Sequence, residues 1–429
     1  MTWRATCVEC GATRAWSHPQ AAGAEQCSCP AGGNLALMPP LGPAARSALL
    51  AAIADGDATH WRYAPLLPAP RPTAGGRAGI RLPVGWTPLI DCGVQGASGG
   101  GVRLLVKDET RNPSGSLKDR ASDVVVAAAR ARGVTAFVAA STGNAAASLA
   151  CIGAAAGVAI TILVPATVPP AKLAQIRAYG ATVRRVAGSY DDAWELAAQV
   201  ARHTGLHNRS TGINPVTREG KKTCALEIAE QMGWQAPDWV VVPTGDGNIL
   251  SAIWKGFCEL RTLGLIGTLP RLVAAQAAAS DAIARAHWGA GGAGLDPAIA
   301  VDAKSADTLA DSISVSWPRD RAAALAALRD SRGLAVTVTE AEIVAGVRAL
   351  ASRFGLFVEP SSAAAFAAFE RVARSGHFEA GQRVVCLATG TGLKDLRAVA
   401  ADTDEAALVA AGDWRAVADA LPLATGTGG

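Results

Sequence analysis

Short apolar runs alternate along this chain with longer stretches that have a helical period. Apolar runs of strand length lie at 102–106, 137–140, 160–165, 239–243 and 384–387, and a further strand is expected at 182–186. After several of these runs the apolar residues recur three and four positions apart, as Ala121, Val124, Val125 and Ala128 do. This spacing is typical of a helix with one buried face. Strands and helices in alternation indicate an α/β fold with a parallel sheet.

A chain of 429 residues is long enough for two or three domains. Because half of the residues are apolar, a substantial core is available. We predict a Cys-rich unit at 1–45, a large domain formed by 46–125 and 225–415, and a small mobile domain at 126–224 inserted between these two segments. The remaining residues, 416–429, are expected to form a tail.

Charge and hydropathy exclude several classes of protein. The net charge is only +4 and the basic residues are scattered, so nucleic-acid binding has little support. No apolar run is long enough to span a bilayer, and the N-terminus lacks the apolar core of a signal peptide. We therefore expect a soluble cytoplasmic protein, in which the nine cysteines are thiols or metal ligands rather than disulfides.

Four cysteines near the N-terminus have the spacing of a metal site. Cys7 and Cys10 form one pair, and Cys27 and Cys29 form a second pair after sixteen intervening residues. Four thiolates on two short turns can close a tetrahedral zinc site, which would stabilise so small a unit. The second pair is C-x-C rather than the commoner C-x-x-C, and His18 could replace one ligand. Free thiols in a flexible leader are the alternative; we favour a structural zinc ribbon.

The run K-D-E-T-R-N-P-S-G-S-L-K-D-R at 107–120 contains the main candidate for chemistry, Lys118. A strand leads into it, Asn-Pro and Ser-Gly mark a tight loop, and Lys118 lies in the first turn of the following helix. The positive end of a helix and partial burial both favour a neutral, nucleophilic amine. Such a lysine forms a Schiff base with a carbonyl, most often that of pyridoxal phosphate. Spacing alone favours a solvated surface lysine, since most lysines lie at the surface.

Three glycine-containing loops directly follow strand-like runs. The loop S-T-G-N at 141–144 starts an alanine-rich helix, so hydroxyls, an amide and helix-start N–H groups meet there. The loop T-G-D-G-N at 244–248 can curl so that several N–H groups face one anion, in front of a helix that starts near Ile249. The loop T-G-T-G at 389–392 follows the last run. Taken singly, each loop also fits an ordinary helix cap or tight turn.

The run at 107–120 resembles the lysine motif of the threonine synthases, which belong to the tryptophan-synthase-β-like (fold type II) pyridoxal phosphate enzymes. Those enzymes read K-D-E-x-x-N-P-T-G-S-F-K-D-R, and this chain differs conservatively at Ser114 and Leu117. With gaps, the resemblance extends from His60 to Asp395. It implies a pyridoxal-phosphate-dependent lyase with two three-layer αβα domains, parallel-rich sheets, a zinc-ribbon-like leader and a homodimeric assembly.

The resemblance also implies a role for each loop. Lys118 would bind the cofactor and act as general base and acid, Asn144 would bond the phenolic oxygen of the cofactor, and Thr389 would face its pyridine nitrogen. The cofactor phosphate would be held at the glycine loop, by Gly245, Asp246, Gly247, Asn248 and Ile249. The substrate-binding residues would be Lys107, Ser141, Thr142 and Arg218.

The chain departs from the family where the substrate phosphate is bound. Ala145 replaces a threonine, Thr211 and Gly212 replace an Asn-Ser pair, and Thr217 replaces an arginine, with Arg218 one place later. A shift of one residue turns a helical side chain by about 100°, so Arg218 is not equivalent to the lost arginine.

Two enzymatic functions therefore stay open. In the first, Arg218, Lys221 or Lys222 re-forms the phosphate site and the chain converts O-phospho-L-homoserine and water to L-threonine and phosphate. In the second, the chain is a paralogue: a threonine or serine dehydratase, or an enzyme of β-replacement on an activated serine, similar to cysteate synthase. A binding protein without activity is disfavoured, because Lys118, Asn144, the glycine loop and Thr389 are all present.

Overall fold

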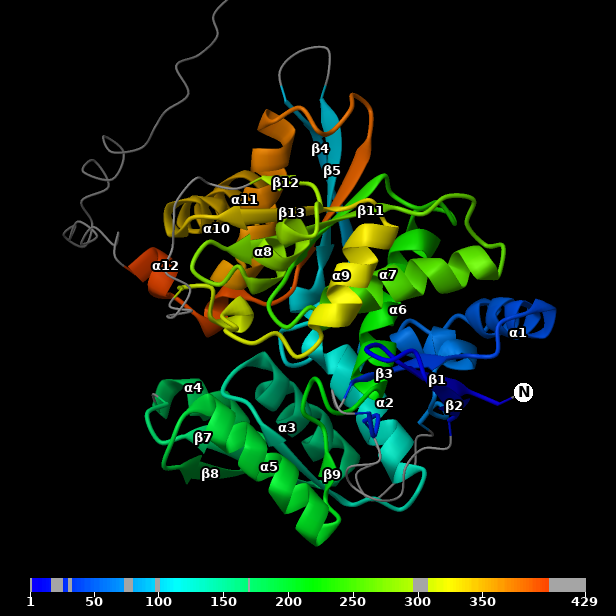
Figure 1. Cartoon of the computed structure of the whole chain (residues 1–429), viewed down its shortest axis with the longest axis vertical. Coiled ribbons are helices and arrows are strands. Elements are labelled where there is room, and N and C mark those ends of the chain that lie inside the picture. The colour runs from blue at the N-terminus through cyan, green and yellow to red at the C-terminus, as the bar shows by residue number, and fades with distance from the viewer. Residues whose placement is uncertain are drawn as a thin grey trace, which may run out of the picture.

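The computed structural model of the chain describes residues 2–16, 26–29, 33–72, 80–96, 101–168, 170–295 and 308–400. His18 and the expected tail at 416–429 lie outside these residues. The chain forms two lobes, each around its own sheet, and a small N-terminal sheet beside them (Figure 1). Among the described residues, none of the helices is both long and apolar enough to cross a membrane.

The large lobe contains a seven-stranded sheet in the order β12-β13-β11-β10-β14-β5-β4. Its strands are β4 Leu89–Gln95, β5 Val102–Asp108, β10 Trp239–Pro243, β11 Arg271–Ala277, β12 Gly294–Leu295, β13 Leu334–Val338 and β14 Arg383–Ala388. Neighbouring strands are parallel except β4, which pairs with β5 in the antiparallel direction. The central strand β10 is buried at all five positions, as expected for a parallel strand covered on both faces.

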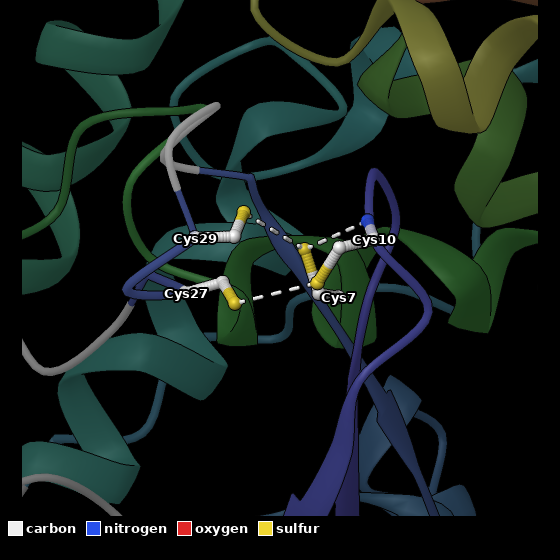
Figure 2. A group of neighbouring side chains, drawn as sticks. All are labelled: Cys7, Cys10, Cys27 and Cys29. Atoms are coloured by element: carbon white, nitrogen blue, oxygen red, sulfur yellow. Dashed lines mark hydrogen bonds between the residues drawn. The ribbon is translucent and has the colours of Figure 1, made fainter.

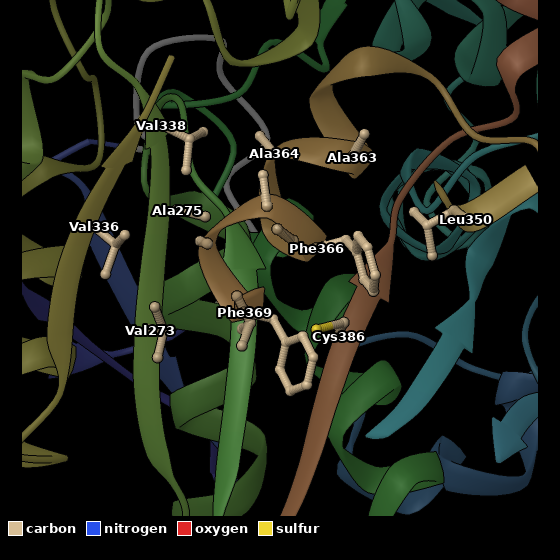
Figure 3. Packing of buried hydrophobic residues seen from close by; sticks show 14 of the residues in the cluster. Val273, Ala275, Val336, Val338, Leu350, Ala363, Ala364, Phe366, Phe369 and Cys386 are labelled. Atoms are coloured by element: carbon tan, nitrogen blue, oxygen red, sulfur yellow. The ribbon is translucent and has the colours of Figure 1, made fainter. Parts of the chain in front are cut away.

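Helices cover both faces of the large sheet. On one face lie α10 Glu340–Phe354 and α11 Pro360–Arg374, and on the other lie α7 Asn248–Thr262, α8 Ala282–Gly289 and α9 Arg321–Asp330. Figure 3 shows α11 above the strands, with Phe366 and Phe369 pointing into the core against Val273 and Cys386. The two phenylalanine rings stack with centroids 6.0 Å apart. This packing confirms the predicted three-layer arrangement.

The small lobe has a four-stranded parallel sheet in the order β8-β7-β6-β9. The strands are β6 Ala136–Ala140, β7 Ala159–Pro165, β8 Thr182–Val186 and β9 His207–Asn208. Helix α5, Tyr190–Thr204, covers one face, and α2 Lys118–Arg130, α3 Asn144–Ala156 and α4 Pro170–Ala178 pack with the other. This lobe is therefore also a three-layer unit.

Two helices run between the lobes, and the predicted domain boundaries fall inside them. The boundary at 125/126 lies within α2, and the boundary at 224/225 lies within α6, Val216–Gln231. The two helices pack closely at Gly220, where a Cβ atom would lie 2.1 Å from the carbonyl oxygen of Arg120. Only glycine therefore fits at this crossing.

A buried ion-pair cluster joins α2, α6 and β5 at the same place. The guanidinium of Arg120 bonds the carboxylates of Glu109 at 2.7 Å and Glu227 at 2.6 Å, and all three side chains are fully buried. Lys107 donates to Glu227 at 2.8 Å. These cations hold the pKa of Glu109 below its usual value against the opposing effect of burial. Loss of one partner would leave an uncompensated buried charge, which is costly.

The N-terminal unit is a three-stranded antiparallel sheet in the order β2-β1-β3. Its strands are β1 Arg4–Cys7, β2 Thr13–Ala15 and β3 Leu35–Met38. Helix α1, Pro43–Ala54, follows, and the 3-10 turn at His60–Leu66 then leads into the large lobe. Three more 3-10 turns lie at Glu109–Arg111, Asp311–Ile313 and Gly392–Lys394, and the short helix α12 spans Arg397–Ala400.

Candidate active site

A cavity of about 590 Å³ brings together Lys118, the S-T-G-N loop and the glycine loop at 244–248. Its lining residues are 139–145, 209–211, 243–250 and 311–317, together with Lys118, Tyr190, Asp191, Trp194, Lys221 and Arg319. The volume is typical of a small-molecule site. The loops come from both lobes, since 139–145 follows β6 of the small sheet and 243–250 follows β10 of the large sheet. Loops at the carboxyl ends of parallel strands commonly form binding sites in such folds.

Lys118 lies in this cavity as the first residue of α2. Its amine makes no hydrogen bond to any residue within the described part of the chain. Burial lowers the pKa of Lys118, and the guanidinium of Arg209 lowers it further, against the opposing effects of Glu359 and Asp246. A larger neutral fraction makes the amine a better nucleophile, as the sequence predicts.

The loop S-T-G-N also lines the cavity, and Asn144 begins α3. The side chain of Asn144 contacts two charged groups that the sequence analysis did not include. Its Nδ2 donates to the carboxylate of Glu359 at 2.8 Å, and its Oδ1 accepts from Lys394 at 2.9 Å. Ser141 and Thr142 are at the cavity surface. The sequence feature that could have identified Glu359 is a carboxylate between the apolar pair Phe357-Val358 and Pro360, the first residue of α11.

The glycine loop forms the opposite wall, and all five of its predicted residues line the cavity. Helix α7 starts at Asn248 without a side-chain cap, so its first N–H groups are available to an anion. Gly247 has a φ of 85°, and a Cβ atom there would lie 2.6 Å from the Cβ of Ala324. A side chain at 247 would therefore be strained and would push the loop away from α9.

Thr389 lies close to Lys118 but is not among the residues that line the cavity. Its carbonyl oxygen accepts a hydrogen bond from the backbone N–H of Leu117, at 2.9 Å, directly before Lys118. Its hydroxyl lies 3.1 Å from that of Ser362. Contact with the pyridine nitrogen stays a prediction for Thr389.

Two of the predicted substrate-binding residues are not at the cavity. The amine of Lys107 is fully buried and donates to the carbonyl of Thr87, to Glu227 and to Gln231, so none of its protons points to a substrate. Arg218 is 3% exposed and pairs with Asp320. Neither side chain lines the cavity, because carboxylates remote in sequence bind both of them, and their contact with a substrate stays a prediction that this geometry does not support.

Asp320, which binds Arg218, also supports the glycine loop from behind. Its second oxygen accepts from Asn248 at 3.0 Å and from Ser251 at 2.9 Å. Lys222, another candidate for the phosphate site, pairs with Glu219 at 2.6 Å and with Glu259 at 2.7 Å. Both cations therefore stabilise the scaffold around the loop.

Three other cations do line the cavity, Lys221, Arg209 and Arg319, of which Arg319 pairs with Asp191. Lys221 donates to the Oδ1 of Asn248 and is 1% exposed. Arg209 follows β9 and was not selected from the sequence, although it stands in the stretch that carries the departures from the family. Thr211 and Ala145, two of those departures, also line the cavity, whereas Thr217 is turned away and donates to the carbonyl of Asn214 at 2.8 Å.

The four N-terminal cysteines converge as Figure 2 shows, with their sulfur atoms all within 4.8 Å of one another. The Sγ atoms of Cys7 and Cys29 are 3.9 Å apart, and those of Cys10 and Cys27 are 3.8 Å apart. Four thiolates at about 2.3 Å from a tetrahedral zinc would be about 3.8 Å apart. The backbone N–H of Cys10 points to the sulfur of Cys7, at 3.5 Å. The donor set therefore fits a structural zinc ion.

The cavity likewise fits pyridoxal phosphate. It offers the amine of Lys118, which bonds none of the described residues, and a set of helix-start N–H groups at 245–249 on the facing wall. Lys118 would bind the aldehyde of the cofactor and the glycine loop would bind its phosphate. When bound, the cofactor supplies an electron sink for the α carbon of an amino acid.

Comparison with known proteins supports this fit. Residues 80–390 match the family described as pyridoxal-phosphate dependent enzyme. The chain is 38% identical over 336 residues to the threonine synthase of Methanocaldococcus jannaschii, covering 78% of this chain and 80% of that protein. It is 37% identical over 340 residues to the threonine synthase of Methanosarcina acetivorans, covering 79% and 81%.

A solved structure, the threonine deaminase of T.th., is similar with a TM-score of 0.55 at 26% identity, covering 68% of this chain and 87% of that one. The family model and the two synthases confirm the predicted lyase and its cofactor. On this evidence the chain belongs to the threonine synthase family of fold type II pyridoxal-phosphate dependent enzymes.

Proposed function

We propose that this enzyme converts O-phospho-L-homoserine and water to L-threonine and phosphate. The observation that carries the proposal is the meeting of Lys118, the S-T-G-N loop, the glycine loop and three further cations in one cavity. A cofactor phosphate needs one anion site. A phosphorylated substrate needs a second, and the cavity contains more cationic groups than the glycine loop alone requires.

The residues around the substrate have distinct roles in this proposal. The amine of Lys118, whose pKa is lowered by burial, removes the proton from the α carbon of the substrate. The same amine then returns a proton to a carbon further along the substrate side chain. The hydroxyls of Ser141 and Thr142 and the N–H groups that start α3 orient the substrate carboxylate. The loop at 311–317 lines the cavity and would limit the access of water to the substrate. We expect the enzyme to act as a homodimer in the cytoplasm.

A second function is favoured by one observation. At the three positions where the family binds the substrate phosphate near α6, Gly212 has no side chain, Thr211 offers one hydroxyl, and Thr217 bonds the backbone of Asn214. If no other residue replaces the phosphate-binding side chains that are missing at these positions, the substrate is a serine or threonine derivative without a phosphate. Dehydration of threonine or serine, or β-replacement on an activated serine, would then be the reaction.

The experiment is incubation of the pyridoxal-phosphate-loaded protein with O-phospho-L-homoserine, followed by assays of phosphate and amino acids. Equal amounts of phosphate and threonine support the synthase. No phosphate release, from a protein whose visible absorbance shows bound cofactor, contradicts it. Formation of ammonia and a 2-oxo acid from L-threonine or L-serine would then support the dehydratase. Lys118→Ala is the control for non-enzymatic release.

A further inference from the structure

Arg209 is a buried cation that no carboxylate neutralises within the described part of the chain. The residue is 1% exposed. Its Nε donates to the hydroxyl of Ser122 at 3.2 Å, and its Nη1 donates to the hydroxyl of Thr211 at 3.4 Å. Its Nη2 is buried and has no hydrogen-bond partner among the described residues. A charged donor that is buried and unsatisfied destabilises the folded protein. Arg209 is therefore not explained by fold stability, and this indicates a role in binding.

The charges around Arg209 do not relieve this cost. Burial lowers the pKa of the Arg209 guanidinium to about 10, with Asp119 and Tyr190 acting in the opposite direction. Asp119 is a weak counterion, because burial raises its own pKa and its carboxylate already accepts from the hydroxyl of Ser114. The nearest cations in the cavity, Lys118 and Lys221, add to the positive potential.

Arg209 and Lys221 belong to different walls of the cavity. Lys221 bonds Asn248 of the glycine loop, where the cofactor phosphate is expected. Arg209 is fixed to the small lobe, since its backbone N–H donates to the carbonyl of Val138 in β6 at 3.1 Å and its guanidinium bonds Ser122 of α2. One phosphate on the glycine loop would therefore satisfy Lys221 and leave Arg209 without an anion.

We infer that Arg209 binds a second anion in this cavity, the phosphate group on the side chain of the amino-acid substrate. A planar guanidinium with one free nitrogen, and a second held only by a neutral hydroxyl, can turn both to a phosphate. The hydroxyl of Thr211, which also lines the cavity, can donate to the same group. This inference rests on the proposed function, because it assigns the group that selects the phosphorylated substrate.

The test compares two ligands that differ only in the phosphate, O-phospho-L-homoserine and L-homoserine. Each is titrated into the cofactor-loaded protein, and binding is followed by the visible absorbance of the cofactor. The wild-type protein should prefer the phosphorylated ligand. Arg209→Gln should reduce this preference by about 100-fold, and Arg209→Lys should keep part of it. Arg202→Gln, which removes the same charge from a half-exposed site on α5, should leave it unchanged.

Three results would overturn the inference. One is an unchanged preference in Arg209→Gln, and another is a wild-type protein with no preference. The third is an equal loss of affinity for pyridoxal phosphate itself in Arg209→Gln, which would assign Arg209 to the cofactor. A structural role predicts a lower thermal midpoint for Arg209→Gln, whereas loss of an unsatisfied buried charge should not lower it.

Failure of the inference and failure of the proposed function give different results. If the wild-type protein releases no phosphate but keeps an Arg209-dependent preference, the function is wrong and the anion site stands. If the wild-type protein makes threonine and Arg209→Gln does so with unchanged KM, the function stands and the site is wrong.

Discussion

Asn144 donates a hydrogen bond from its Nδ2 to the carboxylate of Glu359 at 2.8 Å, across the gap between α3 of the small lobe and α11 of the large lobe. Glu359 is 5% exposed, and burial raises its pKa, although Asn144, Lys394 and Lys118 act in the opposite direction. A carboxyl group with a raised pKa near Lys118 links the stability of the site to pH.

The first prediction concerns this carboxyl group. Since its pKa is higher in the folded than in the unfolded protein, the folded protein holds more protons between the two values, and stability falls as the pH rises through that interval. Glu359→Gln should therefore raise the thermal midpoint of the cofactor-free protein at pH 8, by about 2 °C, and have little effect near pH 4. Glu370→Gln, on the half-exposed side of α11, is the control and should change neither value.

The second prediction concerns Lys118. Lys118→Ala should reduce turnover by about 10³-fold or more, because the variant loses both the cofactor-binding amine and the proton carrier. The visible absorbance of the lysine-bound cofactor should disappear in the same variant. Circular dichroism should show an unchanged fold, since this amine bonds no described residue. Turnover within tenfold of the wild-type value would move the catalytic role to another residue.

The strands and site loops could be predicted because their signals are local. The apolar run at 239–243 matches β10 residue for residue, since a buried parallel strand has to be apolar on both faces. The strand predicted at 182–186 also matches β8, although this strand contains two arginines and none of its positions is buried. Lys118, the S-T-G-N loop and the glycine loop were found for a similar reason. Each lies between a strand and the start of a helix, and the glycine, asparagine and hydroxyl residues that mark such a loop are close together in the sequence.

The partners of the buried charges could not be predicted, because they depend on residues remote in the chain. Lys107 meets Glu227 across 120 positions, and Arg218 meets Asp320 across 102. From the sequence, both cations could bind a substrate, but in the fold a carboxylate already binds each of them. Arg209 is the opposite case: only the folded chain shows that its neighbours are hydroxyls and that one nitrogen has no partner among the described residues.

The third prediction concerns the ion-pair cluster between the lobes. Arg120→Ala would leave Glu109 and Glu227 buried without their main counterion, and should lower the free energy of unfolding by about 3–5 kcal/mol. Urea denaturation followed by fluorescence measures this change. Arg103→Ala, which breaks an exposed pair with Asp91, should leave the urea midpoint unchanged. Equal midpoints for the two variants would mean that the buried cluster is not stabilising.

The fourth prediction concerns the N-terminal cysteines. Residues of the same N-terminal unit, Gln26 and Asn34, bond the backbone of residues at or next to the cavity. Gln26 donates to the carbonyl of Gly212 at 3.2 Å, and Asn34 donates to the carbonyl of Arg319 at 2.7 Å. Gly212 directly follows Thr211, and Arg319 lines the cavity. A metal that fixes the four sulfur atoms would therefore also fix one rim of the substrate site.

The purified protein should contain one zinc ion per chain, and Cys10→Ser should lose it. Removal of the metal by a chelator should raise KM for the substrate by about tenfold with little change in kcat, because the reacting groups lie on other elements. Cys258→Ser, which removes a cysteine of α7 remote from the cluster, should keep both the zinc and the KM. A metal-free protein with unchanged KM would show that the N-terminal unit only stabilises the chain, whereas a rise in KM reversed by added zinc would establish that it positions the substrate loop.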